Sequence, residues 1–216
     1  MIIETRMRYI YIALLSLSVL FGSPDTSRAA SSVTVTPDIT KSLKRIEAYL
    51  DSIKTMQAEF LQISSNGESA SGEILLARPE RLRIEYAPPT PVLIVANGKY
   101  FSYVDTELKQ VNHIPVEDTP AAFLLRKNFS LTEGDLALTN FEQGGNTIRV
   151  SMVQTKDPLA GEFTLVLTDE PMVLRKWSIV DAQGIVTDLT LINARFDFPI
   201  SDDRFITSFP ELDLGR

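Results

Sequence analysis

The feature that most constrains this chain is a change in the spacing of its apolar residues near position 54. From position 37 to that point apolar side chains recur every three or four residues, and beyond it they alternate with polar ones through most of the sequence. The first spacing is typical of an amphipathic helix and the second of half-buried strands. The sequence therefore predicts one long helix followed by a mainly β structure.

The helix is predicted over residues 37–53. Thr36 and Pro37 supply an N-cap and a proline in the first turn, which together are typical of a helix start. The apolar positions that follow are Ile39, Leu43, Ile46, Leu50 and Ile53. The polar positions on the other side are Lys41, Lys44, Glu47 and Asp51. We interpret that polar side as a solvated face.

Short runs with period 2, separated by turn residues, predict the strands. They are expected near 56–60, 72–78 and 82–86, and at 92–96, 99–104, 108–114, 136–142, 147–154, 162–168, 173–181 and 185–196. Because a parallel crossover needs a dozen or more residues, the short connections favour an antiparallel meander. A short helix at 119–125, after Thr119 and Pro120, interrupts it.

Asn97-Gly98 gives the strongest hairpin signal, since both residues tolerate the positive φ of a tight turn. A turn at these two residues would place Ala96 opposite Lys99, Ile94 opposite Phe101 and Val92 opposite Tyr103. Both faces of this hairpin would be apolar. We expect a helix to cover one of them and a partner strand the other.

The first residues are those of a secretory signal peptide. Arg6 and Arg8 precede an apolar stretch at 9–21, which is too short to cross a bilayer, and Ser27-Arg28-Ala29 is a small-residue cleavage site. The expected division is a signal peptide at 1–29 and a single domain at 30–216, with export to the periplasm. The alternative is a retained membrane anchor.

Composition excludes several kinds of chemistry. The 216 residues include one histidine and no cysteine, so disulfides, thiolate metal sites and cysteine nucleophiles are excluded. The formal net charge of −7 disfavours nucleic acid as a partner. His113 lies in a predicted strand without the serine motif of a hydrolase. We expect no catalytic residue, no metal and no cofactor.

The order of several short segments resembles the LolA family, the periplasmic outer-membrane lipoprotein carriers of Gram-negative bacteria. These segments follow the helix and are residues 56–62, Gly72 to Pro79, residues 82–86 with Pro88-Pro89, residues 94–99, and Thr119-Pro120 with Leu124-Leu125. The resemblance covers nearly all of the chain after residue 30.

The resemblance implies an unclosed antiparallel β-barrel of about eleven strands, covered by short helices around a hydrophobic cavity. Such a carrier accepts acylated lipoproteins from the inner-membrane LolCDE transporter and delivers them to the outer membrane, in many species through the receptor LolB. We expect this chain to act as a monomer and not as an enzyme. Arg78 matches the arginine that latches the lid of the family.

For this chain, the expected cavity wall is Met56, Phe60, Leu82, Ile84, Tyr86, Ile94, Phe101 and Tyr103. The expected lid is Thr119, Pro120, Phe123, Leu124 and Leu125. We expect Arg78 to donate hydrogen bonds to carbonyl groups of the lid.

Three alternatives remain open at this point. The first is a periplasmic lipid sensor, or a carrier of another lipid or glycolipid, on the same fold. The second is a secreted hydrolase that uses two carboxylates, since sequence alone cannot exclude a suitable pair. The third is a closed barrel of the lipocalin type, against which both predicted helices count.

Overall fold

A computed structural model describes residues 33–116, 125–131 and 134–206. The predicted signal peptide and the lid residues Thr119, Pro120, Phe123 and Leu124 lie outside the described residues. The elements in chain order are α2 (Pro37–Ser52), β1 (Thr55–Ser64), β2 (Ser69–Ala77), β3 (Arg81–Tyr86), β4 (Val92–Asn97), β5 (Tyr100–Asp105), β6 (Gln110–Pro115), β7 (Leu136–Gly144), β8 (Thr147–Gln154), β9 (Gly161–Thr168), β10 (Val173–Asp181), β11 (Val186–Phe196) and the 3₁₀ helix η4 (Asp202–Phe205).

The long helix begins and ends where its sequence predicts. The Ile39 N–H donates to the Thr36 side-chain oxygen at 3.3 Å, and Pro37 occupies the first turn. At the other end the Ile53 N–H donates to the Leu50 carbonyl. The face that carries Leu43, Ile46 and Leu50 is buried, because it packs against the sheet.

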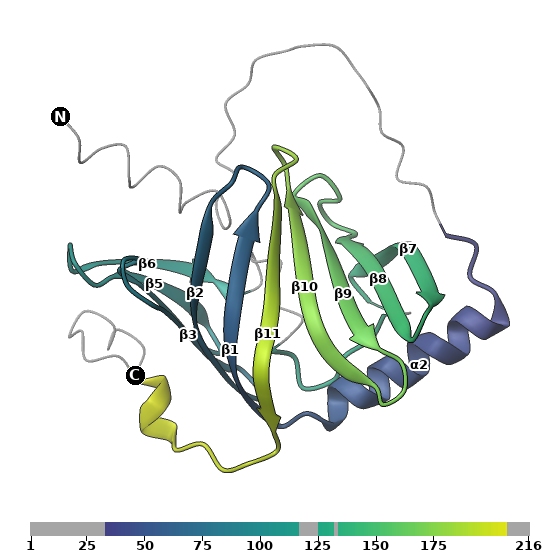
Figure 1. Ribbon diagram of the computed structural model, residues 1–216, viewed down its shortest axis with the longest axis horizontal. Coiled ribbons are helices and arrows are strands. Elements are labelled where there is room, and N and C mark those ends of the chain that lie inside the picture. Colours follow the sequence, from purple (N-terminus) through teal and green to yellow (C-terminus); the bar gives the residue numbers. More distant parts are fainter. Residues whose placement is uncertain (1–32, 117–124, 132–133, 207–216) are drawn as a thin grey trace.

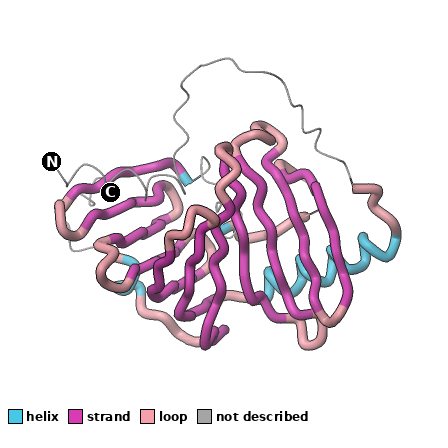
Figure 2. The backbone as a smooth tube through the Cα atoms, turned by 45° about the horizontal axis from the view of Figure 1, so that its top comes forward, coloured by secondary structure: helices cyan, strands magenta, loops and turns pink. Residues whose placement is uncertain are grey.

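All eleven strands form one antiparallel sheet with the order β6-β5-β4-β3-β2-β1-β11-β10-β9-β8-β7. The first and last strands of the chain therefore pair at the centre, and β6 and β7 form the two edges. The sheet curls around one side, as Figures 1 and 2 show. This confirms the predicted unclosed half-barrel, and the closed-barrel alternative is wrong because the ladder does not join β6 to β7.

The hairpin of β4 and β5 differs from the prediction by two residues in register. Ala96 lies opposite Phe101, and Ile94 lies opposite Tyr103. The turn consists of Gly98 and Lys99, with φ of +93° at Gly98. The Asn97 side-chain oxygen accepts hydrogen bonds from the backbone N–H groups of Lys99 and Tyr100, both at 3.2 Å. Asn97, the last residue of β4, thus caps the turn with its side chain. Because the register differs by two residues, every side chain stays on its predicted face of the sheet.

The main core lies on the concave side of the sheet and includes the buried face of α2. Hydrogen bonds place this helix on the half that contains β7 to β10. The Ser42 hydroxyl donates to Gln143 on β7 at 2.9 Å, and the Leu174 N–H on β10 donates to the Tyr49 hydroxyl at 3.0 Å. Arg45 forms an ion pair with Asp169, which follows β9, at 2.9 Å.

Two smaller apolar clusters lie on the convex side. Leu75 and Ala77 pack against Phe205 of η4. Leu93, Val95 and Val104 form the outer face of the β4–β5 hairpin. Side chains on both faces of this hairpin are therefore buried, while the expected cover, a helix on one face and a partner strand on the other, stays a prediction. None of the described helices has the length and apolar character to span a bilayer.

Candidate functional site

The residues predicted to line a cavity come together on the concave side of β1, β3, β4 and β5. We call this set the concave wall: Met56, Phe60, Leu82, Ile84, Tyr86, Ile94, Phe101 and Tyr103. All eight belong to one apolar cluster, and Ile84, Tyr86 and Tyr103 are the members that keep part of their surface exposed. Their role in binding a lipid stays a prediction.

Strand register explains why distant residues meet in this wall. Ile84 on β3 lies opposite Ile94 on β4, and Ile94 in turn lies opposite Tyr103 on β5. Phe60 on β1 lies opposite Gly72 on β2, where a Cβ atom would come within 2.8 Å of the Phe60 ring. Glycine at 72 therefore leaves the space that this ring occupies.

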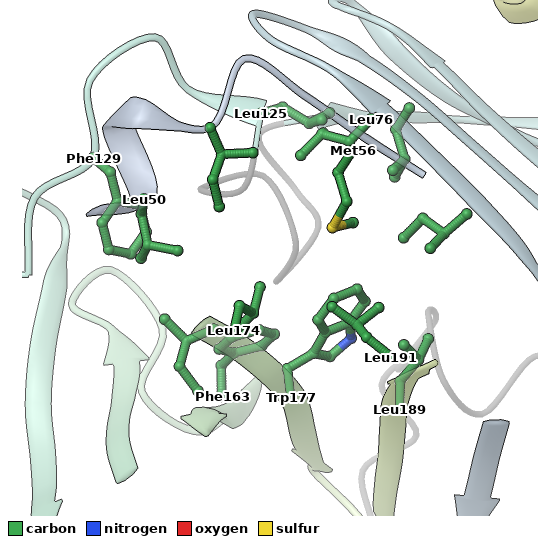
Figure 3. Packing of buried hydrophobic residues seen from close by; sticks show 14 of the residues in the cluster. Leu50, Met56, Leu76, Leu125, Phe129, Phe163, Leu174, Trp177, Leu189 and Leu191 are labelled. Atoms are coloured by element: carbon green, nitrogen blue, oxygen red, sulfur yellow. The ribbon is translucent and has the colours of Figure 1, made fainter. Parts of the chain in front are cut away.

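A second group of apolar side chains faces the wall from β10 and β11, and sequence reasoning did not assign it to the site. It consists of Leu174, Trp177, Leu189 and Leu191. Figure 3 shows these side chains pointing toward Leu50, Met56 and Leu125. Their period-2 spacing in the sequence was the available signal, but it did not reveal which strands would face each other.

Arg78 lies in the turn between β2 and β3, and its side chain is only 5% exposed. Its Nη1 donates to the Leu50 carbonyl at 2.7 Å and lies 3.8 Å from an Asp51 carboxylate oxygen. Burial lowers the pKa of the guanidinium below its ordinary value, while Asp51 acts in the opposite direction. In the described residues, Arg78 therefore anchors the C-terminal end of α2.

The interpretation of Glu47 and Asp51 as part of a solvated face is wrong. The Asp51 carboxylate accepts a hydrogen bond from the Phe129 N–H at 2.8 Å. The Glu47 carboxylate accepts hydrogen bonds from the Leu131 N–H at 2.5 Å and the Ser130 hydroxyl at 3.2 Å. Because the two carboxylates are one helical turn apart, they hold the segment 129–131 against α2.

Leu125 is the one predicted lid residue that the structure describes. It is buried in the main cluster, and its carbonyl accepts a hydrogen bond from the Glu80 N–H at 3.0 Å. Phe129 and Leu131 are buried in the same cluster. The turn that contains Arg78 therefore contacts the end of α2 through the Arg78 side chain and Leu125 through the Glu80 N–H.

One polar pair stands within the apolar wall. The Tyr86 hydroxyl donates to the Gln62 side-chain oxygen at 2.8 Å, and the Tyr86 ring meets Phe60 edge-on with 5.2 Å between centroids. Burial raises the pKa of Tyr86 to about 12. The phenol therefore stays neutral and keeps its proton for this hydrogen bond.

His113 lies on the exposed side of edge strand β6. Its Nδ1 is 3.0 Å from the Ser102 hydroxyl, and Ser102 alternates with the inward-facing Phe101 and Tyr103. The pair is therefore on the convex side of the sheet, away from the concave wall.

An open sheet with an apolar concave face, partly covered by a helix, is typical of proteins that enclose apolar surface. The family model described as outer membrane lipoprotein carrier protein LolA matches residues 51–208. The chain therefore belongs to the LolA family, which is a family of lipoprotein carriers.

Several individual proteins are similar to this chain. An outer-membrane lipoprotein carrier protein from Azotobacter vinelandii is 27% identical over 180 residues, covering 79% of this chain and 86% of that protein. An uncharacterised protein from Rickettsia prowazekii is 26% identical over 170 residues, covering 79% of this chain and 78% of that protein. Among solved structures, a LolA superfamily protein from Nitrosomonas europaea matches with a TM-score of 0.47 and 12% identity, covering 76% of this chain and 97% of that chain.

Proposed function

We propose that this protein carries the acyl chains of lipoproteins through the periplasm against its concave wall. The observation that carries the proposal is a continuous apolar cluster on the inner side of an open sheet, with Ile84, Tyr86 and Tyr103 still partly exposed. Membership of the LolA family supports the lipoprotein as cargo. The predicted lid at 119–125 would complete the enclosure.

The physical requirement for such a carrier follows from the hydrophobic effect. A lipoprotein anchor has about three acyl chains of about fifteen methylenes each. Transferring these chains from the membrane to water would cost a free energy on the order of 30 kcal/mol, at about 0.8 kcal/mol per methylene. Strands suit the task because alternate side chains face inward and outward, so one surface is apolar and the other remains hydrated.

We also infer the route from the family. A signal peptide at 1–29 would export the chain, an inner-membrane LolCDE transporter would load it, and an outer-membrane acceptor such as LolB would receive the cargo. Arg78 would set the position of the lid, since its side chain already holds the C-terminal end of α2. The protein would act as a monomer and would need no cofactor.

The direct test is native mass spectrometry of the protein purified from the periplasm. We expect a population that carries an acylated polypeptide. A co-purifying glycolipid or free lipid would favour a sensor or another carrier on the same fold. Turnover of a sugar polymer that single Asp or Glu replacements abolish would favour the hydrolase alternative.

A matched pair of substitutions tests the concave wall itself. Ile84→Glu places a charge on the partly exposed wall, whereas Ile63→Glu places the same charge on the convex side of β1, where Ile63 is 52% exposed. A buried unpaired charge is strongly unfavourable, so acyl chains should avoid the first variant and tolerate the second. We expect only Ile84→Glu to lose lipoprotein in the same mass spectrometry assay, with both variants folded by circular dichroism. Equal loss, or no loss, would contradict the wall assignment.

A further inference from the structure

The concave face of β1 changes from apolar to polar along its length. Met56, Ala58 and Phe60 are buried and apolar, and the next two inward positions are Gln62 and Ser64. The Ser64 hydroxyl lies 3.1 Å from the Thr187 hydroxyl on β11. The polar end of this strand is therefore continuous with the wall that we propose for acyl chains.

Gln62 and Tyr86 meet across an intervening strand because that strand carries small residues. Ala70 on β2 lies opposite Gln62, and Gly72 lies opposite Tyr86. The side chains from β1 and β3 can therefore extend over β2 and form the 2.8 Å hydrogen bond from the Tyr86 hydroxyl to Gln62 Oε1.

This hydrogen bond determines which end of the Gln62 amide is available. Its oxygen is engaged by Tyr86, while its Nε2 makes no hydrogen bond within the described residues. No side-chain nitrogen or oxygen of the described residues is both buried and unpaired, so Nε2 is open to solvent. The apolar wall thus presents one oriented pair of N–H donors.

The distance along β1 fits the size of an acyl chain. Six residues separate Met56 from Gln62, and strands advance about 3.3 Å per residue, which gives about 20 Å. This length is comparable to that of an extended long acyl chain. A chain whose tail reaches Met56 would place the group at its head beside Gln62.

We propose that Gln62 donates a hydrogen bond from Nε2 to the ester carbonyl that joins an acyl chain to the glyceryl group of the cargo. An ester carbonyl accepts but cannot donate, so the free amide N–H is the complementary group. Tyr86 acts as a positioning residue, because it holds the amide oxygen and leaves the nitrogen toward the cargo. This inference rests on the proposed function and adds the linkage that the site recognises.

The experiment compares two lipopeptides that differ only in this linkage. One carries a dipalmitoylglyceryl cysteine with two esters, and the other carries the dihexadecyl ether analogue, which has the same chains without carbonyls. One neutral hydrogen bond contributes about 0.5–1.5 kcal/mol, so the protein should bind the ester about 2- to 10-fold more tightly. Binding is measured by displacement of a fluorescent fatty acid from the signal-free protein.

Three variants decide what causes the preference. Gln62→Met is close in shape and lacks donors, so it should bind both lipopeptides equally. Tyr86→Phe keeps the ring and loses the hydroxyl, so it should reduce the ratio without abolishing binding of the ether. Gln57→Met is the matched control, because Gln57 lies on the outward-facing side of β1 and bonds to Glu73 there. It should keep the full preference.

The possible failures are distinguishable. If the protein binds neither lipopeptide, the proposed function fails. If the protein and Gln62→Met bind both equally tightly, the carrier function stands and the ester subsite is wrong. If the Gln62→Met variant does not fold, the Tyr86→Phe variant decides. An unchanged ratio of ester to ether affinity in Tyr86→Phe would then overturn the proposal. Tighter binding of dipalmitoylphosphatidylglycerol than of the ester lipopeptide would overturn the assignment of the ester to a lipoprotein.

Discussion

The concave face has two parts that share one sequence pattern but differ in what covers them. Beneath α2, the inward side chains of β8 and β9 are buried, and four of them are no more than 1% exposed: Ile148, Val150, Leu165 and Leu167. Away from α2, Ile84, Tyr86 and Tyr103 remain partly exposed. The first part is occupied by the protein's own helix, and the second is where we propose that cargo binds. Apolar alternation therefore does not by itself distinguish core from binding surface.

The largest expected effect is on stability beneath α2. Leu165→Ala should lower the free energy of unfolding by about 2–5 kcal/mol, because a fully buried leucine leaves a cavity. Ile84→Ala, on the partly exposed side, should cost only about 1 kcal/mol. Urea denaturation at constant m-value measures both. Equal losses would show that the two parts of the concave face are packed alike.

The next effect concerns the connection between the two parts. Arg78→Leu removes the donor to the Leu50 carbonyl and should destabilise the C-terminal end of α2 by about 1.5–3 kcal/mol, since the lost hydrogen bond involves a charged donor. Hydrogen exchange in α2 should become faster, and the rate of lipoprotein transfer should change.

Arg78→Lys serves as the control for charge. Lysine keeps the positive charge but lacks the planar guanidinium fork, so it should restore only part of the effect. Unchanged loading and transfer in Arg78→Leu would contradict a latch at this position.

A smaller effect is expected where α2 holds the segment 129–131. Glu47→Gln replaces a charged acceptor by a neutral one and should weaken the hydrogen bond from the Leu131 N–H by about 1 kcal/mol. Exchange of the Leu131 amide should then be about fivefold faster. Lys44→Gln, at an exposed position on the same helix, is the control and should leave that amide unchanged. Identical exchange in both variants would show that Glu47 does not hold the segment.

The smallest effect is a pH dependence on the convex side. Burial tends to raise the pKa of Asp188, but hydrogen bonds from Lys176 and Ser178 outweigh it and hold the pKa below its ordinary value. A carboxylate with a depressed pKa stabilises the folded state above the pKa of the unfolded chain, and this stabilisation is lost as pH falls through the folded value. Because the group is partly exposed, the contribution should be small.

Asp188→Asn tests this dependence. The variant should show a shallower loss of urea midpoint between pH 7 and pH 3 than the unmodified protein, with lipoprotein binding unchanged at pH 7. The same slope in both proteins would show that Asp188 does not contribute to acid sensitivity.

Local patterns predicted the strands well because each strand depends on its own alternation. The expected ranges 147–154 and 173–181 coincide with β8 and β10. The hairpin register was less predictable, since Asn97 could enter the turn or cap it from the strand. The structure shows the second arrangement, in which the Asn97 side chain satisfies two backbone N–H groups.

The site was predictable only in part. The concave wall could be predicted from the inward positions of β1 and of β3 to β5. The facing group around Trp177 and Leu189 could not be predicted, because β10 and β11 come next to β1 only through the pairing of β1 with β11. The partners of Glu47 and Asp51 lie about eighty residues further along the chain. No helical periodicity could reveal them.

The amino-acid sequence alone determined which residues form a helix or strands and which face of each is apolar, because these properties depend on neighbours a few positions away. The tertiary structure decided which half of the concave face α2 covers, which carboxylates hold the segment 129–131, and that Gln62 meets Tyr86 across β2. These arrangements depend on contacts between residues far apart in the chain, whose relative positions exist only once the sheet has assembled.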